Sequence, residues 1–305
     1  MKTIYYSDPL HDDFANNGIK SKSLPKNYKY IRKNPVRRSF DFLLHHCVAI
    51  PVGYVYQKVR FREKIVNRRA LMPYLVSGFY LYGNHTRAAG DAFTPNMIAF
   101  PRKAFIVTSS DAVAIPGVRQ LVASLGGIPL PDTLSGMRKF RDALAKRSRH
   151  GCVCIYPEAH IWPYYTGIRP FPDTAFRYPV EYGKPVFAFT VTYQKRKYHL
   201  SPKTVVYIDG PFFPDPALTT RENSAMLREM VYTAMLKRSK RSTYERYRYV
   251  QKNKETEKDN AVAEDAIRQY TDKCAFLLEF LTNPEIPFII RTELFVNFHG
   301  RKICP

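Results

Sequence analysis

Between about residues 75 and 210, short runs of β-branched and aromatic residues alternate with helical stretches, and this alternation limits the possible folds most strongly. Strands separated by helical segments are typical of α/β domains, because a parallel strand pair needs a long crossover connection. We therefore predict an α/β fold with a mostly parallel central sheet flanked by helices. The expected strands lie at 78–83, 103–108, 152–156, 186–193 and 204–209, and the expected helices at 118–125 and 134–148.

The segments outside this α/β core, which we place at 75–215, differ from it in composition. Residues 1–38 are polar and basic and are expected to form an N-terminal arm. Residues 39–74 are apolar and aromatic with basic residues towards their end, which favours interfacial helices at a membrane over an ordinary core helix. Pro51 should kink a helix there. Residues 216–305 are predicted to be a charged, helical C-terminal extension that serves in docking, as a lid or in packing.

The chain carries 48 Lys and Arg against 26 Asp and Glu, a formal net charge of +22, which suggests a polyanionic partner. An anionic membrane surface and nucleic acid both meet that description. No helix-turn-helix, zinc-finger or RRM signature is present, so we expect no nucleic acid. No run of about 20 apolar residues predicts a membrane span. The five cysteines are scattered, which fits a reducing compartment, and Cys152 and Cys154 are expected in the core.

His85 differs from the other histidines because it follows an apolar strand through Gly83 and Asn84. Ligands of open α/β sheets gather at the carboxyl ends of strands. Asp91 lies six residues further on, and a histidine with a nearby carboxylate is the minimum requirement for general-base catalysis on a hydroxyl. Taken alone, this spacing is weak evidence, and it favours a structural histidine over a catalytic one.

A second strand ends in Tyr156-Pro157-Glu158, which places another carboxylate at the same edge of the predicted sheet. Arg169 and Arg177 follow closely in sequence. One interpretation is that Glu158, Arg169 and Arg177 belong to a surface that binds anions. The other is that Glu158 is a structural acid of a loop or a helix N-cap.

Four blocks of sequence, in order, resemble the glycerolipid acyltransferase family. They are Asn84-His85-Thr86 with Asp91, then Leu125-Gly126-Gly127-Ile128-Pro129, then Tyr156-Pro157-Glu158, and finally Pro185 to Val191. This family of 1-acylglycerol-3-phosphate and lysophospholipid acyltransferases has an NH-x4-D motif and a later F-P-E-G-T-R-S block.

The resemblance implies transfer of a fatty acyl group from acyl-CoA or acyl carrier protein to a hydroxyl of a lysophospholipid or related glycerolipid. His85 would be the general base and Asp91 would orient it, with no metal and no cofactor. The expected partners are an acyl donor and an anionic membrane, with the protein peripheral or monotopic at the cytoplasmic face. Substrate contacts are expected from Asn84, Thr86, Arg87, Glu158, Arg169 and Arg177.

The sequence departs from the family pattern in three places. Five residues rather than four separate His85 from Asp91, so their contact requires a loop, in which Gly90 could absorb the extra residue. The arginines associated with the acceptor phosphate are replaced by Pro131-Asp132 and within Ala159-His160-Ile161. A family member that binds lipid without turning it over, and less plausibly a basic nucleic-acid-binding protein, are the alternatives.

Overall fold

The computed structural model describes residues 2–14, 24–25, 28–87, 89–110, 118–252 and 268. The chain divides into two compact units, Met1–Val250 and Gln251–Pro305, and all elements described below lie in the first except the last residue of β9. In chain order its elements are β1 (Lys2–Tyr6), α1 (Pro35–Leu43), η1 (Leu44–Ala49), α2 (Ile50–Phe61), β2 (Lys64–Val66), η2 (Arg68–Tyr74), β3 (Phe79–Gly83), α3 (Gly90–Ala99), β4 (Ala104–Thr108), α4 (Val118–Leu125), β5 (Gly127–Pro129), α5 (Leu134–Arg147), β6 (Cys152–Ile155), η4 (Thr174–Phe176), α6 (Arg177–Glu181), β7 (Val186–Arg196), β8 (His199–Phe212), α7 (Thr220–Ser239) and β9 (Tyr247–Gln251).

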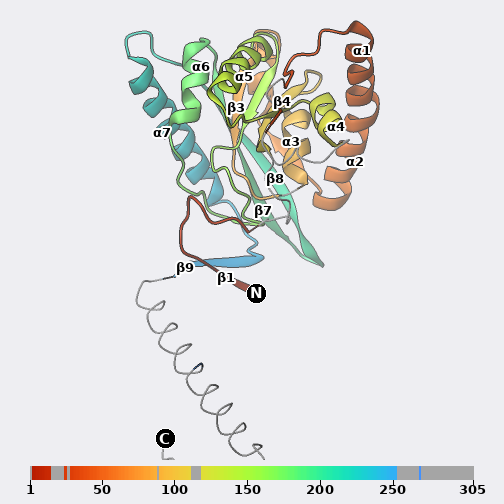
Figure 1. Ribbon diagram of the computed structural model, residues 1–305. Coiled ribbons are helices and arrows are strands. Elements are labelled where there is room, and N and C mark those ends of the chain that lie inside the picture. Colours follow the sequence, from red (N-terminus) through yellow and green to blue (C-terminus); the bar gives the residue numbers. More distant parts are fainter. Residues whose placement is uncertain are drawn as a thin grey trace, which may run out of the picture. The chain divides into compact units, whose positions relative to one another are not determined.

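Seven of the described strands form one sheet in the order β2-β8-β7-β3-β6-β4-β5 (Figure 1). Every neighbouring pair is parallel except β7 and β8, which a short turn joins into an antiparallel hairpin. The α/β prediction with a mostly parallel central sheet is therefore confirmed. The three central strands β3, β6 and β7 are buried on both faces, as their apolar sequences require.

Alternating side chains of the central strands supply two hydrophobic cores, one on each face of the sheet. Phe79 and Leu81 pack with residues of α3 and η2, whereas Tyr80 and Tyr82 pack with residues of α5 and α7. Helices thus cover both faces, as Figure 1 shows for α3 and α7. Cys152 and Cys154 are both buried in the first of these cores, as the sequence predicts.

Helical residues run without interruption from α1 through η1 into α2, and the kink that Pro51 predicts stays a prediction. The middle part, η1, is a π-helix, and the amide of Ile50 donates to the carbonyl of His45, five residues earlier. This wider turn accommodates Pro51, whose ring and missing N–H disturb an ordinary α-helical turn. No helix in the described ranges has the length and hydropathy that a membrane span requires.

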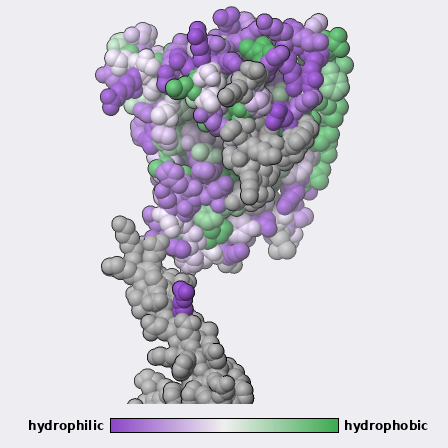
Figure 2. Space-filling view, viewed as in Figure 1, coloured by the Kyte–Doolittle hydropathy of each residue, from purple (hydrophilic) through white to green (hydrophobic). Residues whose placement is uncertain are grey.

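The helices α1 and α2 carry large apolar side chains on their outer surface, which we call the apolar helical face (Figure 2). Val36, Phe40, Leu43, Val52, Val55 and Val59 are each more than half exposed. The predicted helices are therefore present at 35–61, while their contact with a membrane stays a prediction.

Parts of the two terminal segments pack against the core. β1 pairs with β9, and the indole Nε1 of Trp162 donates to the carbonyl of Asp12 at 2.8 Å. α7 begins with a capping box between Thr219 and Glu222 and packs Leu227 into the core beneath the sheet. Most of the predicted extension after Lys252 lies outside the described residues, and the predicted segment boundaries stay predictions.

Candidate active site

The loop that follows β3 positions the candidate site at the carboxyl edge of the sheet. Asn84 ends the strand by exchanging two hydrogen bonds with the backbone of Val191, donating from Nδ2 at 3.1 Å and accepting at Oδ1 at 2.8 Å. Gly83 is required just before it, because a Cβ atom there would lie 2.1 Å from the ring of Phe189. These contacts fix the backbone from which His85 projects.

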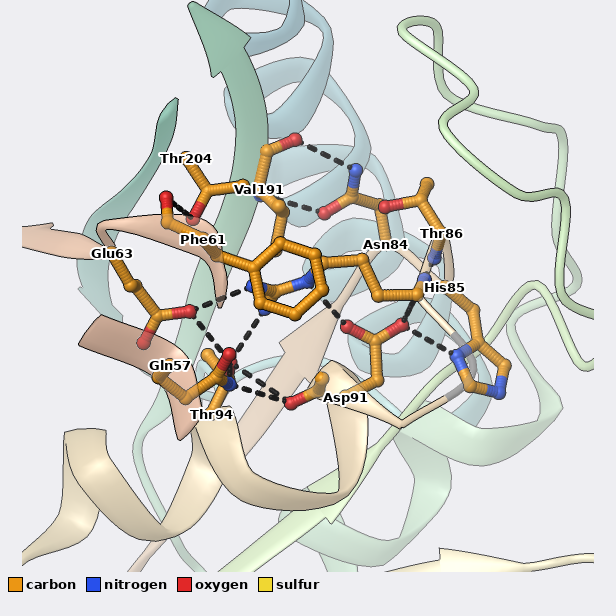
Figure 3. A network of polar contacts seen from close by, with 12 residues as sticks. Gln57, Phe61, Glu63, Asn84, His85, Thr86, Asp91, Thr94, Val191 and Thr204 are labelled. Atoms are coloured by element: carbon orange, nitrogen blue, oxygen red, sulfur yellow. Dashed lines mark hydrogen bonds and ion pairs between the residues drawn. The ribbon is translucent and has the colours of Figure 1, made fainter. Parts of the chain in front are cut away.

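His85 and Asp91 are in contact (Figure 3). The Nδ1 atom of His85 lies 2.9 Å from Oδ2 of Asp91. The same oxygen accepts hydrogen bonds from the amides of Thr86 at 3.0 Å and Arg87 at 2.9 Å. The Asp91 side chain is 1% exposed and that of His85 18%. An acceptor held this firmly favours the tautomer with the proton on Nδ1, which leaves Nε2 as the basic nitrogen.

The loop that the sequence predicts between His85 and Asp91 is present, since α3 begins only at Gly90. The expected contribution of Gly90 is wrong in detail, because its φ is not in the left-handed region. Its missing Cβ instead makes room for Arg87, whose Nε, Cδ and Cζ atoms would lie 3.0 to 3.1 Å from a Cβ at this position. Gly90 therefore acts through close packing and not through backbone freedom.

Arg87 joins this pair to a buried polar cluster on α3 and at the end of α2. Its Nε donates to Oδ1 of Asp91 at 3.3 Å, its Nη1 to Oε2 of Glu63 at 2.8 Å and its Nη2 to Oγ1 of Thr94 at 2.5 Å. Burial alone would lower the pKa of Arg87, but Glu63 and Asp91 outweigh it and raise that pKa. Arg87 is therefore a permanent buried cation.

Tyr156 and Glu158, which follow β6, hold His85 from the other side. The Tyr156 ring stacks on the imidazole with centroids 4.3 Å apart, and its hydroxyl donates to the carbonyl of Asp91 at 2.7 Å. Glu158 accepts from the amides of His85 and Arg169, both at 2.9 Å. Burial raises the pKa of Glu158, against the opposing effect of Arg169 and these amides.

A cavity of about 1070 Å³ opens beside His85. Ligand pockets commonly measure roughly 300–1,000 Å³, so this one is large enough for a lipid chain. Most of its wall is apolar, and its polar residues include His85, Asp91, Asp13 and His160. The apolar wall includes side chains of α3, β4, α4 and α5 and the side chain of Leu130 after β5, among them Phe93, Met97, Ile106, Val122, Leu125, Leu130 and Phe140.

The predicted site residues fall into two groups. His85, Asp91 and Arg177 line the cavity, and Arg177 forms an exposed ion pair with Glu181 at 3.0 Å. The other five are at most 3% exposed and lie behind the cavity wall. Their contact with substrate stays a prediction. They are Asn84, Thr86, Arg87, Glu158 and Arg169.

Sequence reasoning missed several residues that hold the site in place. Tyr156 is part of the Tyr156-Pro157-Glu158 block in the sequence but was given no role of its own. Glu63 and Thr94 gave no signal, since nothing in the sequence places a residue of the α2–β2 connection beside the loop after β3. Tyr193, whose hydroxyl lies 2.8 Å from Oγ1 of Thr86, was assigned only to a strand.

Within the described ranges, no group of three or more His, Cys, Asp or Glu side chains is placed to hold a metal ion. No protein-family model matches the sequence, and no curated protein matches it. Among solved structures, the chain is similar to the crystal structure of the 1-acyl-sn-glycerophosphate acyltransferase PlsC from Thermotoga maritima. The identity is 15% and the TM-score 0.47, over 70% of this chain and 86% of that one.

Proposed function

We propose that this protein is an O-acyltransferase that moves a fatty acyl group from acyl-CoA or acyl carrier protein to a hydroxyl of a lysophospholipid or related glycerolipid. The observation that carries the proposal is the His85–Asp91 pair in the wall of a large, mostly apolar cavity. A general base next to a space for an acyl chain is the arrangement that such a transfer needs. The four sequence blocks that resemble the glycerolipid acyltransferases support it independently.

In the proposed reaction, Nε2 of His85 takes the proton of the acceptor hydroxyl as its oxygen attacks the thioester carbonyl. Asp91 stabilises the imidazolium through Nδ1. The tetrahedral intermediate then expels the thiolate, which recovers the proton from His85, and the ester is formed. The protein forms no covalent bond to the acyl group in this scheme.

We also propose that the reaction takes place at the cytoplasmic surface of a membrane. The apolar helical face and the net charge of +22 support this location, because apolar burial and attraction to anionic lipids add together. A lysophospholipid is an amphiphile, so such a surface would supply the acceptor directly.

The test is acyl transfer from radiolabelled acyl-CoA or acyl carrier protein to a panel of lysophospholipids, with His85→Ala and a matched control. His199→Ala is that control, since His199 is an exposed histidine of the β7–β8 hairpin, outside the cavity. We expect labelled product from the wild type and the control, and none above background from His85→Ala. Equal product from all three proteins would exclude His85 as the base. Binding of lipid without product in the wild type would favour a non-catalytic lipid-binding protein.

A further inference from the structure

We infer that Glu63 and Arg87 are positioning residues for the general base: together they orient the Asp91 carboxylate and set the net charge that His85 faces. This inference rests on the proposed function and deepens it. Neither residue lines the cavity, and both are at least 96% buried. They therefore act on the reaction through Asp91 and not through the substrate.

The orientation of the Asp91 carboxylate follows from the different hydrogen-bond partners of its two oxygens. Oδ2 faces Nδ1 of His85 at 2.9 Å, and Oδ1 accepts from Nε of Arg87 at 3.3 Å. The guanidinium also donates to Glu63 at 2.8 Å and to Thr94 at 2.5 Å. Because its planar donors point in fixed directions, Arg87 bound at three places holds the Asp91 carboxylate in a single rotation.

A surrounding frame keeps Glu63 in place (Figure 3). Oγ1 of Thr94 donates to Oε2 of Glu63 at 2.9 Å. Nε2 of Gln57 donates to that hydroxyl oxygen at 2.7 Å and to the carbonyl of Gly90 at 2.8 Å. The Phe61 ring covers the Arg87 guanidinium, with Cζ 5.1 Å from its centroid. Among the side chains of this network, Oε1 of Gln57 is buried without a hydrogen-bond partner, while the groups around Glu63 and Arg87 are bonded in a way that favours one arrangement.

The charge balance explains why Glu63 matters to a histidine that it does not touch. Two carboxylates, Glu63 and Asp91, surround one guanidinium, so the cluster holds one negative charge in excess while His85 is neutral. Protonation of His85 compensates this excess, which lies on carboxylates that are almost completely buried. Glu63 therefore favours the imidazolium, and Arg87 opposes it.

Other ionisable groups also face His85 or its cavity, and none of them is replaced in the Glu63 and Arg87 variants. Opposite changes in the His85 pKa on replacing Glu63 or Arg87 must then arise from those two residues. The groups that no variant changes are Asp91 of α3, Tyr156, Glu158 and His160 after β6, His45 of η1, Asp13 of the N-terminal segment, and Arg141, Arg169, Arg177 and Tyr178.

The direct test is an NMR titration of histidine-labelled full-length protein, with the His85 signal assigned from a His85→Gln spectrum. Glu63→Gln should lower the pKa of His85 and Arg87→Gln should raise it, because the first removes a negative and the second a positive charge from the cluster. The double variant restores the original balance and should return the pKa to the wild-type value. Arg87→Lys keeps the charge and should change the pKa least. It also remains informative if Arg87→Gln fails to fold, which circular dichroism would detect.

The kcat values of these variants then distinguish the effect of orienting Asp91 from the effect of charge on the His85 pKa. The acid limb of the kcat profile against pH should follow the two pKa shifts, to lower pH for Glu63→Gln and to higher pH for Arg87→Gln. Arg87→Lys should lower kcat with little change in that limb. Turnover by the wild type, with the pKa unchanged or shifted in the same direction in both folded variants, would overturn this inference and leave the proposed function standing. If the two variants shift the His85 pKa in opposite directions but the wild type transfers no acyl group, the proposed function is refuted instead.

Discussion

Asp91 receives hydrogen bonds on both carboxylate oxygens, and this arrangement decides how His85 is presented. Oδ2 is shared by the imidazole and the amides of Thr86 and Arg87, while Oδ1 faces the Arg87 guanidinium. Because Oδ2 of Asp91 accepts a hydrogen bond from Nδ1 of His85, it keeps the proton on that nitrogen. Nε2 is then free to take the proton of the substrate hydroxyl, as general-base catalysis requires.

Asp91→Asn should therefore lower kcat by about two to four orders of magnitude without unfolding the protein. The amide has the shape of the carboxylate but presents neither the charge nor the same pair of acceptors. Asp209→Asn is the matched control, because Asp209 forms a comparable ion pair with Arg238 at 2.5 Å and does not line the cavity. Initial rates of acyl transfer measure the effect. If Asp91→Asn keeps more than half of the wild-type rate, Asp91 does not orient and stabilise His85 in catalysis.

Ala159, directly after Glu158, has a φ of +63°, in the left-handed region that favours glycine. The family block that this segment resembles has glycine at the corresponding position. We expect Ala159→Gly to raise the free energy of unfolding by about 1 kcal/mol, since the strain relieved exceeds the entropy lost. Urea unfolding with an unchanged m-value would measure it. A lower midpoint would show that the methyl group of Ala159 contributes more through packing than its backbone costs.

At the scale of elements, the sequence predicts the parts whose pattern is local. β3, β6 and β7 are short apolar runs bounded by turn residues, and each is found within a few residues of its predicted position. The π-helical turn of η1 was not predictable, because Pro51 signals a disturbance but not its form. The ion pair of Glu63 with Arg87 was equally hidden, since it depends on how α2 and α3 meet. The site therefore follows from sequence only as far as the loop after β3.

Helix α2 has two distinct faces, and this gives a prediction for the element as a whole. Gln57 and Phe61 point into the buried cluster, while Val52 and Val59 are 57% and 76% exposed. The double variant Val52→Glu/Val59→Glu should bind vesicles more weakly and keep its thermal stability, because the changed side chains are mostly exposed. Vesicle flotation measures this. Met230→Glu on α7, also an exposed apolar position, is the control and should bind normally. Unchanged binding by the double variant would place the docking surface elsewhere.

For the whole molecule, the net charge of +22 determines how binding should respond to salt. Each basic residue near an anionic surface contributes about 1 kcal/mol, and the Debye length falls from about 10 Å at 0.1 M salt to about 3 Å at 1 M. Binding to vesicles with anionic lipid should therefore weaken strongly over this range. Some binding should remain, because the apolar helical face does not depend on charge. Complete loss in high salt, or tighter binding to DNA than to vesicles at equal salt, would contradict the membrane assignment.

The central claim is that His85 activates an acceptor hydroxyl for direct transfer from a thioester. The most direct measurement is the release of free thiol from acyl-CoA or acyl-loaded carrier protein, with and without a lysophospholipid, in the wild type and in His85→Ala. The account predicts rapid release by the wild type only when an acceptor is present, and background release by His85→Ala in both conditions. Equal release with and without acceptor, or rapid release by His85→Ala, would contradict it.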